Sequence, residues 1–333
     1  MVRASITRLY SKIRQVSEPK LAAAERKIAE LQAQLKASQA SHSKAVLALE
    51  KARNTKARKI QIGSSKRQRK SDIVEVILAD VHGSKQNPAA VKAALADIKT
   101  LQPDRVVLLG DILDCGGFLA EHHTLAFVPE INDGGYEADI AAANAFLDAL
   151  TDAAPGAETI FVAGNHEHRV ERWILKQKLS RREDVDFLLR QFGAQHVLRL
   201  EERGIEYYPY GQINDGYSVR GWVEIDGLHF THKVSNARGA AQAALQRTTG
   251  SIIFGDTHRQ DYYPISDQQG NIRAAWNTGC LCEPQPYYAQ TRNTGWTHGY
   301  CVRFIDSKTK TWQMVQILIQ KGRSMAGHIF NAK

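Results

Sequence analysis

Carboxylate, imidazole and amide side chains recur where short apolar runs of this sequence end. They are Asp80 and His82 in D-x-H, Asp111 and Asp114 in G-D-x-x-D, Asn165 and His166 in G-N-H-E, His232 in F-T-H-K, and Asp256 and His258 in G-D-T-H. A mixed set of oxygen and nitrogen donors suits Mn²⁺, Fe or Zn²⁺ better than Ca²⁺, which prefers oxygen donors. The residue types therefore predict a site for divalent transition-metal cations.

The spacing of these residues indicates how cations would be held. Side chains two residues apart on a strand point the same way, so we expect Asp80 and His82 to bind one cation together. A carboxylate from the next strand end can bridge two cations about 3.5–4 Å apart, which is the spacing of two-metal hydrolysis. Asp111 is the candidate bridge.

The elements that must position these side chains alternate in type along the chain. The runs at 73–80, 105–111 and 158–166 are rich in β-branched residues and each ends in polar residues, with helical patterns between them at 88–100 and 136–152. Beyond Gly204 the sequence is rich in strand patterns, with a hairpin turn expected at 225–227. This order predicts an α/β layered domain whose strands present site residues at their C-terminal ends.

Taken in order, the motifs from Asp80 to His258 resemble those of the calcineurin-like metallophosphoesterase family. The resemblance runs from about Val74 to Leu281 and includes N-T-G-C-L after the last histidine motif. It implies a calcineurin-like layered sandwich of two mixed β-sheets flanked by helices over residues 71–320, with 321–333 as a C-terminal tail. The basic, helix-led architecture favours a bacteriophage or bacterial member. The activity it implies is hydrolysis of phosphoester bonds with two divalent cations.

The resemblance also implies a role for each motif residue. The first cation would be bound by Asp80, His82, Asp111 and His258, and the second by Asp111, Asn165, His232 and Asp256. His166 would not be a ligand: it would act beside the phosphoryl group as a general acid or as a hydrogen-bond donor in the transition state, oriented by Asp114. A hydroxide held between the cations would be the nucleophile, because metal binding brings the pKa of water towards neutrality.

One position departs from the family pattern. The last motif usually reads G-H-x-H, whereas this sequence has Asp256 at the first histidine position. A carboxylate ligand there adds negative charge and favours harder ions, so we expect Mn²⁺ ahead of Fe, Zn²⁺ or Mg²⁺. The alternative is that Asp256 is not a ligand and the second cation binds weakly.

Four further residues are candidates for substrate binding. Arg169 and Arg172 follow G-N-H-E at the start of a predicted helix, where either guanidinium could bind a phosphate with two hydrogen bonds. His122 and His123 lie in a long insertion between the second and third motifs, where a loop would overhang the site. The alternative for this pair is two surface histidines with no role in binding.

Residues 1–70 form a basic arm. They contain 18 Lys/Arg and 4 Asp/Glu, net +14, whereas the remaining 263 residues carry 26 and 31, net −5. The composition of 17–59 predicts one long helix, and the heptad seam that begins at Leu21 is interrupted at Ser38 and His42, so any coiled coil is weak. A basic linker follows to Lys70. Such a block predicts contact with a polyanion such as nucleic acid, or with an anionic surface. The alternatives are a solvated helical face followed by a disordered basic linker, and a helix used for homo-oligomer assembly.

Composition narrows the protein class further. The sequence has no apolar stretch of membrane-span length and no signal-peptide pattern at its start, so we expect a cytoplasmic protein with no membrane partner. Its four cysteines, Cys115, Cys280, Cys282 and Cys301, fit reduced thiols. The leading hypothesis is a phosphodiesterase or nuclease acting on nucleic acid. The alternatives are a small-molecule or nucleotide phosphoesterase or protein phosphatase, and a non-catalytic nucleic-acid-binding protein.

Overall fold

The structure is a computed structural model. It describes residues 72–116, 118, 135–210, 212–214, 217–219, 221–286, 293–324 and 326, together with positions 26, 27, 29, 30, 32, 33 and 36. Those N-terminal positions are helical and exposed. The chain divides into two compact units, 1–56 and 57–333, and the second unit is described below. The predicted coiled coil and linker of the basic arm lie otherwise outside the described residues.

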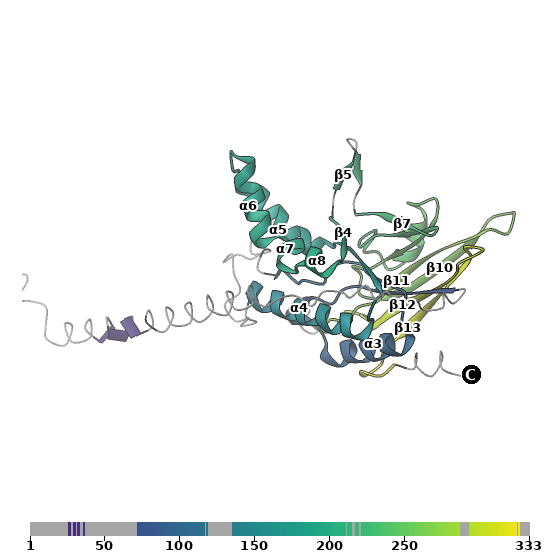
Figure 1. Ribbon diagram of the computed structural model, residues 1–333, viewed down its shortest axis with the longest axis horizontal. Helices are drawn as coiled ribbons and strands as arrows, with labels where there is room; N and C mark the ends of the chain where they lie inside the picture. The colour runs from purple at the N-terminus through teal and green to yellow at the C-terminus, as the bar shows by residue number, and fades with distance from the viewer. Residues whose placement is uncertain are drawn as a thin grey trace, which may run out of the picture. The chain divides into compact units, whose positions relative to one another are not determined.

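The first of two large sheets has six strands and is mixed (Figure 1). Its strands, in spatial order, are β13 (Trp312–Leu318), β12 (Gly299–Asp306), β1 (Asp72–Leu78), β2 (Arg105–Leu108), β3 (Glu158–Val162) and β4 (Glu206–Tyr208). Strands β1 to β4 run parallel, and β12 and β13 are antiparallel to their neighbours. The carboxyl ends of β1, β2 and β3 therefore lie at one edge.

The second large sheet has five strands in the order β10 (Gln260–Ser266), β11 (Ile272–Thr278), β9 (Ser251–Phe254), β8 (Leu228–Phe230) and β7 (Val223–Ile225). The pairs β8–β9 and β9–β11 are parallel. The predicted turn joins β7 to β8, where Asp226 and Gly227 both adopt the left-handed conformation of a type I′ hairpin turn. A separate two-stranded sheet consists of β5 (Gln212–Asn214) and β6 (Tyr217–Val219).

Helices cover the outer faces of both sheets. Those on the first sheet's side are η1 (Gly83–Lys85), α3 (Pro88–Leu101), α4 (Gly135–Ala153), α5 (Asn165–Lys176), α6 (Arg182–Phe192), α7 (Ala194–Val197) and α8 (Leu200–Arg203), and α9 (Ala240–Leu245) packs on the second sheet. Helix α3 begins as expected at Pro88, because the Asn87 side chain accepts a hydrogen bond from the Ala90 amide and proline is tolerated in the first turn.

The alternation of side chains along β1 explains the layering. Val76 and Leu78 pack in the core formed with α3 and α4, whereas Ile77 and Ala79 pack against Phe230 and other residues of the second sheet. A strand buried on both faces needs apolar residues on both sides, which β1 supplies from Val76 to Leu78. The predicted α/β sandwich of two mixed sheets flanked by helices is therefore confirmed.

A buried ion pair adds to the contact between the sheets. Arg303 on β12 lies 2.8 Å from a Glu75 carboxylate oxygen through Nε and donates to the other oxygen at 3.0 Å through Nη2. Its Nη1 donates to the carbonyl of Ile225 in the second sheet, and its guanidinium lies 5.2 Å from the Phe230 ring centroid. Both partners of the ion pair are fully buried, so each charge is stabilised by the other and not by water.

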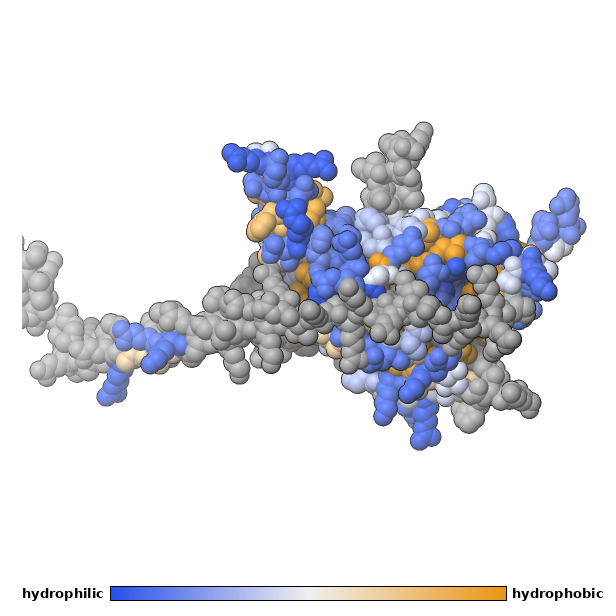
Figure 2. Space-filling view, in the orientation of Figure 1, coloured by the Kyte–Doolittle hydropathy of each residue, from blue (hydrophilic) through white to orange (hydrophobic). Residues whose placement is uncertain are grey.

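The surface combines charged and apolar areas. Figure 2 shows a largely hydrophilic face, with apolar colour beside the hydrophilic outer part of α6. Leu175 on α5 and Phe187 on α6 are more than half exposed. Among the described residues, no helix is long and apolar enough to cross a membrane.

Candidate metal centre

Every candidate ligand lies just beyond a strand end or at the start of α5. Asp80 and His82 follow β1, Asp111 follows β2, Asn165 begins α5 after β3, His232 follows β8, and Asp256 and His258 follow β9. Because the strands before these loops are parallel within each sheet, their carboxyl ends bring the side chains to a common edge. The structure thus brings together residues separated by up to 178 positions.

The expected reason for the pairing of Asp80 and His82 was wrong. Strand β1 ends at Leu78, so both residues lie in a loop, where strand alternation does not orient them. Instead, both adopt the left-handed conformation, with φ of 56° and 57°. Their amides donate hydrogen bonds to the carbonyls of Gly110 and Asp111, which ties the loop after β1 to the loop after β2.

The left-handed conformation recurs at three more candidate ligands. Asp111, Asp256 and His258 have φ of 52°, 65° and 58°. This region is sparsely populated by residues other than glycine, and each such residue costs on the order of 1–3 kcal/mol unless local hydrogen bonds compensate. Five residues with this backbone conformation in one buried site indicate that contacts from the rest of the fold hold these side chains in place.

The first group of ligand atoms is compact. One donor atom from each of Asp80, His82, Asp111 and His258 lies within 4.8 Å of the other three, and all four residues are buried. His258 Nε2 is 3.1 Å from Asp80 Oδ1 and 3.1 Å from His82 Nε2. His82 Nε2 is 3.8 Å from Asp111 Oδ2. These separations fit donors that share one cation.

A second group meets the first at Asp111. His232 Nε2 is 3.1 Å from Asp111 Oδ2 and 3.9 Å from Asp256 Oδ1. The other ring nitrogen of His232, Nδ1, donates to the Leu109 carbonyl at 2.5 Å, which orients the ring so that Nε2 faces Asp111. Asp111 Oδ2 is therefore approached by imidazoles of both groups, as a bridging carboxylate requires.

Unsatisfied polar atoms test whether these residues fit metal ions. Among the described residues, three buried atoms of the two groups make no hydrogen bond: Asp80 Oδ1, His232 Nε2 and Asp256 Oδ2. Asn165 Oδ1, at the start of α5, is also buried without one. An unpaired buried polar atom costs about 1–3 kcal/mol, so folded proteins rarely keep several together. Cations coordinated by these atoms would satisfy them, and the residues therefore fit a two-metal centre.

The pKa shifts of the buried histidines also fit a metal centre. Burial opposes the charged form of His232, but the carboxylate of Asp111 beside it raises the pKa of this imidazole to about 10. Burial likewise opposes protonation of His82, and hydrogen bonds to Asp114 and Asp80 raise its pKa above the usual value. Protons on the histidines thus balance the carboxylates. A metal ion must displace them, so its binding releases protons and strengthens as the pH rises.

Asp256 differs from the other carboxylates because it has a cationic partner. Lys233 Nζ lies 2.8 Å from Asp256 Oδ1, while Oδ2 is buried without a hydrogen bond among the described residues. The Asp256 amide also donates to Asp80 Oδ2 at 3.1 Å. One oxygen is thus held by an ammonium group and the other is free to face a cation.

His166 lies at the edge of both groups. Its backbone amide donates to Asp111 Oδ1 at 2.9 Å, and its Nε2 is 3.5 Å from Asp111 Oδ2. Its Nδ1 is 2.6 Å from the backbone carbonyl of Asp114 and 3.5 Å from the Asp114 carboxylate. Burial lowers the pKa of His166, against the raising effect of Asp111, which favours a neutral ring that donates a hydrogen bond.

The carboxylate of Asp114 is closer to a different histidine than expected. It lies 3.1 Å from His82 Nδ1, which is shorter than its distance to His166. A carboxylate on the far nitrogen of a metal-ligand histidine fixes the ring and increases its basicity. Asp114 orients His166 chiefly through its backbone carbonyl and His82 through its side chain.

The candidate substrate residues have different positions. Arg169 donates to the Asp114 carbonyl at 2.9 Å and places its guanidinium nitrogens 2.6 and 2.8 Å from the ring nitrogens of His166, so it lies in the site. Arg172 is exposed on α5. His122 and His123 lie outside the described residues.

Two carboxylates outside the predicted set position the ligand loops. Glu167, buried in the first turn of α5, accepts four backbone hydrogen bonds, from the amides of Asp111, Ile112, Leu113 and Gly164. Asp139 on α4 accepts hydrogen bonds from the amides of Asp114 and Cys115. Glu167 stands at the third position of α5 and accepts from the amide of the N-cap residue Gly164, which is the half of a capping box that a glycine N-cap allows. Nothing in the sequence connects Asp139 to the loop after β2.

The end of β11 and the segment that follows it also hold the ligand loops in place. The Asn277 side chain donates to the Gly255 carbonyl at 2.7 Å, which anchors the loop that carries Asp256. The Leu281 amide donates to the Asp80 carbonyl at 3.0 Å. This explains in physical terms why N-T-G-C-L follows the last motif. All four cysteines of the chain are free and buried, as expected for reduced thiols.

The sequence matches the model of the calcineurin-like phosphoesterase family over residues 76–260, more than half of the chain. The chain therefore belongs to the calcineurin-like phosphoesterase family and is a metal-dependent phosphoesterase. It is 25% identical to the Gene 54 protein of Mycobacterium phage D29 over 264 residues, 77% of this chain and 97% of that protein. It is 23% identical to the Gene 54 protein of Mycobacterium phage L5, over 73% of this chain and 93% of that protein.

Similar solved structures include a phosphoesterase of E. coli, Yfce, which is 16% identical with a TM-score of 0.29 and covers 74% of this chain and 100% of its own. A dimetal phosphatase from Danio rerio is 12% identical with a TM-score of 0.33 and covers 74% of this chain and 99% of its own.

The contacts of Glu167 predict that it controls metal affinity without binding metal. In Glu167→Gln, an amide NH₂ would face backbone N–H donors, so the loop carrying Asp111 should shift. We expect divalent cation affinity, measured by calorimetry, to fall about 10–100-fold, as for other partners outside the ligand shell. Glu171→Gln on the same helix, where Glu171 pairs with His168, is the matched control. Equal cation affinity in both variants would contradict the role of Glu167.

Proposed function

We propose that this protein hydrolyses phosphodiester bonds of nucleic acid at a centre of two divalent cations. The observation that carries the catalytic part is the bridging geometry of Asp111, whose Oδ2 lies 3.8 Å from His82 Nε2 and 3.1 Å from His232 Nε2. The unsatisfied atoms around it support two cations rather than one.

The proposed ligand sets follow from these groups. The first cation is bound by Asp80, His82, Asp111 and His258, and the second by Asp111, Asn165, His232 and Asp256 through its free oxygen. Three carboxylates in the combined set favour Mn²⁺ over softer ions. Lys233 offsets part of the charge that Asp256 adds.

When bound, the two cations supply an activated water and neutralise charge on the phosphoryl oxygens. The residues of the chain supply orientation and proton control. His166, in its protonated form, donates a hydrogen bond or a proton from Nε2 to the leaving oxygen, while its Nδ1–H stays on the Asp114 carbonyl. Arg169, which contacts both ring nitrogens of His166, adds positive charge beside the phosphoryl group.

The nucleic-acid substrate is proposed from the charge distribution. Residues 71–333 carry a net charge of −5, so away from the cations this region repels a polyanion, whereas residues 1–70 carry +14. A long anionic substrate would bind more tightly because the basic arm attracts its negative charge. A small phosphoester, which occupies only the metal centre, would not.

The two-metal assignment predicts a strict metal requirement and a dominant role for Asp111. Chelated protein should be inactive and regain activity best with Mn²⁺. Asp111→Asn keeps the side-chain shape and the left-handed backbone but removes the bridging charge. We therefore expect kcat/KM to fall by more than about 100-fold, which is the largest loss usual for a residue that only orients a metal ligand. The control is Asp186→Asn on α6, where Asp186 pairs with Arg182. Turnover by the chelated protein would refute the assignment.

The role of His166 predicts a dependence on the leaving group. His166→Ala should keep both cations and slow hydrolysis by about 10²–10⁴-fold, the range for a positioned acid. The loss should be greater for an alkyl or nucleoside ester than for a nitrophenyl ester, because nitrophenolate leaves without a proton. His168→Ala, two residues along α5, is the control. Equal losses on both esters would assign His166 to stabilisation of phosphoryl oxygens instead.

The proposed role of the basic arm predicts that binding and hydrolysis are separable. Removing residues 1–70 should weaken binding to DNA or RNA and make the dependence of affinity on salt shallower, since fewer counterions are released. Hydrolysis of a small ester should be unchanged, because every proposed ligand lies beyond residue 70. An unchanged salt slope together with an altered oligomeric state would instead assign the arm to assembly and favour small phosphoester substrates.

A further inference from the structure

Cys282 is a buried thiol in the wall of the metal centre that the hydrolytic site does not use. It is 3% exposed and lies four residues beyond the end of β11. Its segment is fixed to the loop that follows β1: Asn87 donates to the Leu281 carbonyl at 2.8 Å, and Glu283 donates to the Lys85 carbonyl at 2.9 Å. The backbone on both sides of Cys282 is thus tied to the loop that carries His82.

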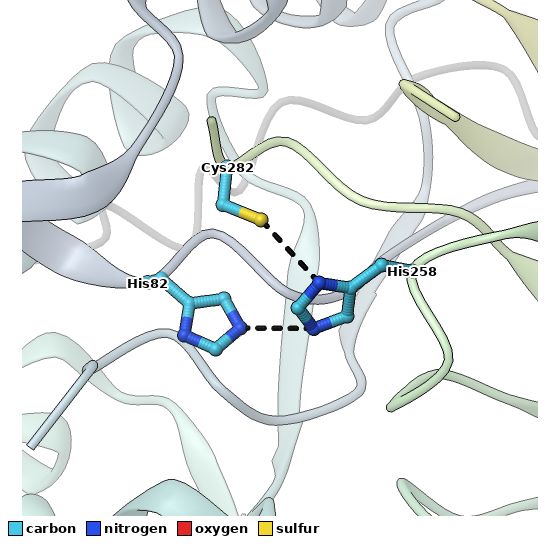
Figure 3. A group of neighbouring side chains, drawn as sticks. All are labelled: His82, His258 and Cys282. Carbon is cyan, nitrogen blue, oxygen red and sulfur yellow. Dashed lines mark hydrogen bonds between the residues drawn. The ribbon is translucent and has the colours of Figure 1, made fainter. Parts of the chain in front are cut away.

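The thiol faces a histidine that also faces the carboxylates (Figure 3). Cys282 Sγ lies 3.6 Å from His258 Nδ1, while His258 Nε2 lies 3.1 Å from His82 Nε2. One donor atom from each of Cys282, His82 and His258 lies within 4.8 Å of the other two. Asp80 Oδ1 is 3.1 Å from His258 Nε2, the ring nitrogen on the side away from the thiol.

These donors match the needs of a soft cation. Zinc bonds of about 2.3 Å to sulfur and 2.0–2.1 Å to nitrogen place tetrahedral donors about 3.3–3.6 Å apart. The Cys282 Sγ–His258 Nδ1 contact of 3.6 Å is within this range. His82 Nε2 lies 3.1 Å from the other ring nitrogen of His258, Nε2, so a cation bound at Nδ1 requires the His82 ring to shift towards it. Two imidazoles and a thiolate select Zn²⁺ or Cd²⁺, whereas the carboxylate-rich set around Asp111 favours Mn²⁺.

We propose that Cys282, His82 and His258, the last through its Nδ1, form a thiophilic cation site that binds Zn²⁺ or Cd²⁺. On binding, the S–H bond of Cys282 breaks, a sulfur–metal bond forms and the proton passes to solvent, with no change in oxidation state. The site takes His82 and His258 from the proposed first hydrolytic cation. A soft cation bound here therefore competes with the Mn²⁺ form of the centre.

The site is tested on the full-length, metal-free protein by titration with Cd²⁺ alone. We expect an ultraviolet thiolate-to-cadmium charge-transfer band that saturates at one thiolate per chain. Cys282→Ala should abolish the band and lower Cd²⁺ affinity by more than about 100-fold, the upper range for a residue that acts only through a ligand. Its Mn²⁺ affinity should change by less than about tenfold, since Mn²⁺ favours the oxygen donors.

Cys301→Ala and Cys280→Ser are the matched controls. Cys301 is a buried thiol between the sheets, and Cys280 is the thiol two residues before Cys282. Both variants should keep the band. The proposal is overturned if wild-type protein gives no band, if the band persists in Cys282→Ala, or if it follows Cys280.

Cadmium NMR of the wild-type protein gives an independent measurement, should Cys282→Ala fail to fold. A chemical shift typical of sulfur coordination supports the site, and one typical of oxygen and nitrogen ligands alone overturns it. Neither measurement depends on turnover, so an inactive phosphoesterase with a thiolate–cadmium band would refute the proposed function and leave this site standing.

Discussion

The structure is organised around a group of carboxylates and imidazoles that are buried together with too few partners of their own. Asp80, Asp111 and Asp256 place three carboxylates around the same histidines, and two of their oxygens make no hydrogen bond among the described residues. Such a group is unfavourable unless positive charge fills it. Protonated His82 and His232 do so without metal, and divalent cations would do so more completely. The neighbouring contacts serve to keep this group in place.

Its support comes from segments distant in sequence. Glu167 binds four backbone amides and thereby joins the loop after β2 to the start of α5. Asp139 holds the next two amides from α4, and the segment after β11 pairs with the loop after β1. These hydrogen bonds compensate for the left-handed backbone at five candidate ligands, which would otherwise relax. Rigid loops fix the donor positions before a cation arrives, which favours binding.

The same centre offers donors of two kinds. Oxygen atoms dominate around Asp111, while the thiol of Cys282 lies on the far side of His258. His258 therefore stands between hard and soft ligands, and the identity of the cation decides which set is used. Lys233 on Asp256 shows a comparable balance, because its ammonium reduces the negative charge on the side of His232.

The sequence alone determined the α/β class, helices α3 and α4, and every candidate ligand, because apolar runs and the polar residues that end them are local patterns. Asp111 was predicted as the bridge from its place after the second strand. The sequence did not reveal why Asp80 and His82 converge, which histidine the Asp114 carboxylate contacts, or the roles of Asp139, Lys233 and Cys282. Those depend on loops from different strands meeting at one sheet edge, and on backbone conformations that distant hydrogen bonds impose. Contacts of this kind leave no periodic pattern along the chain, so only the tertiary structure decides them.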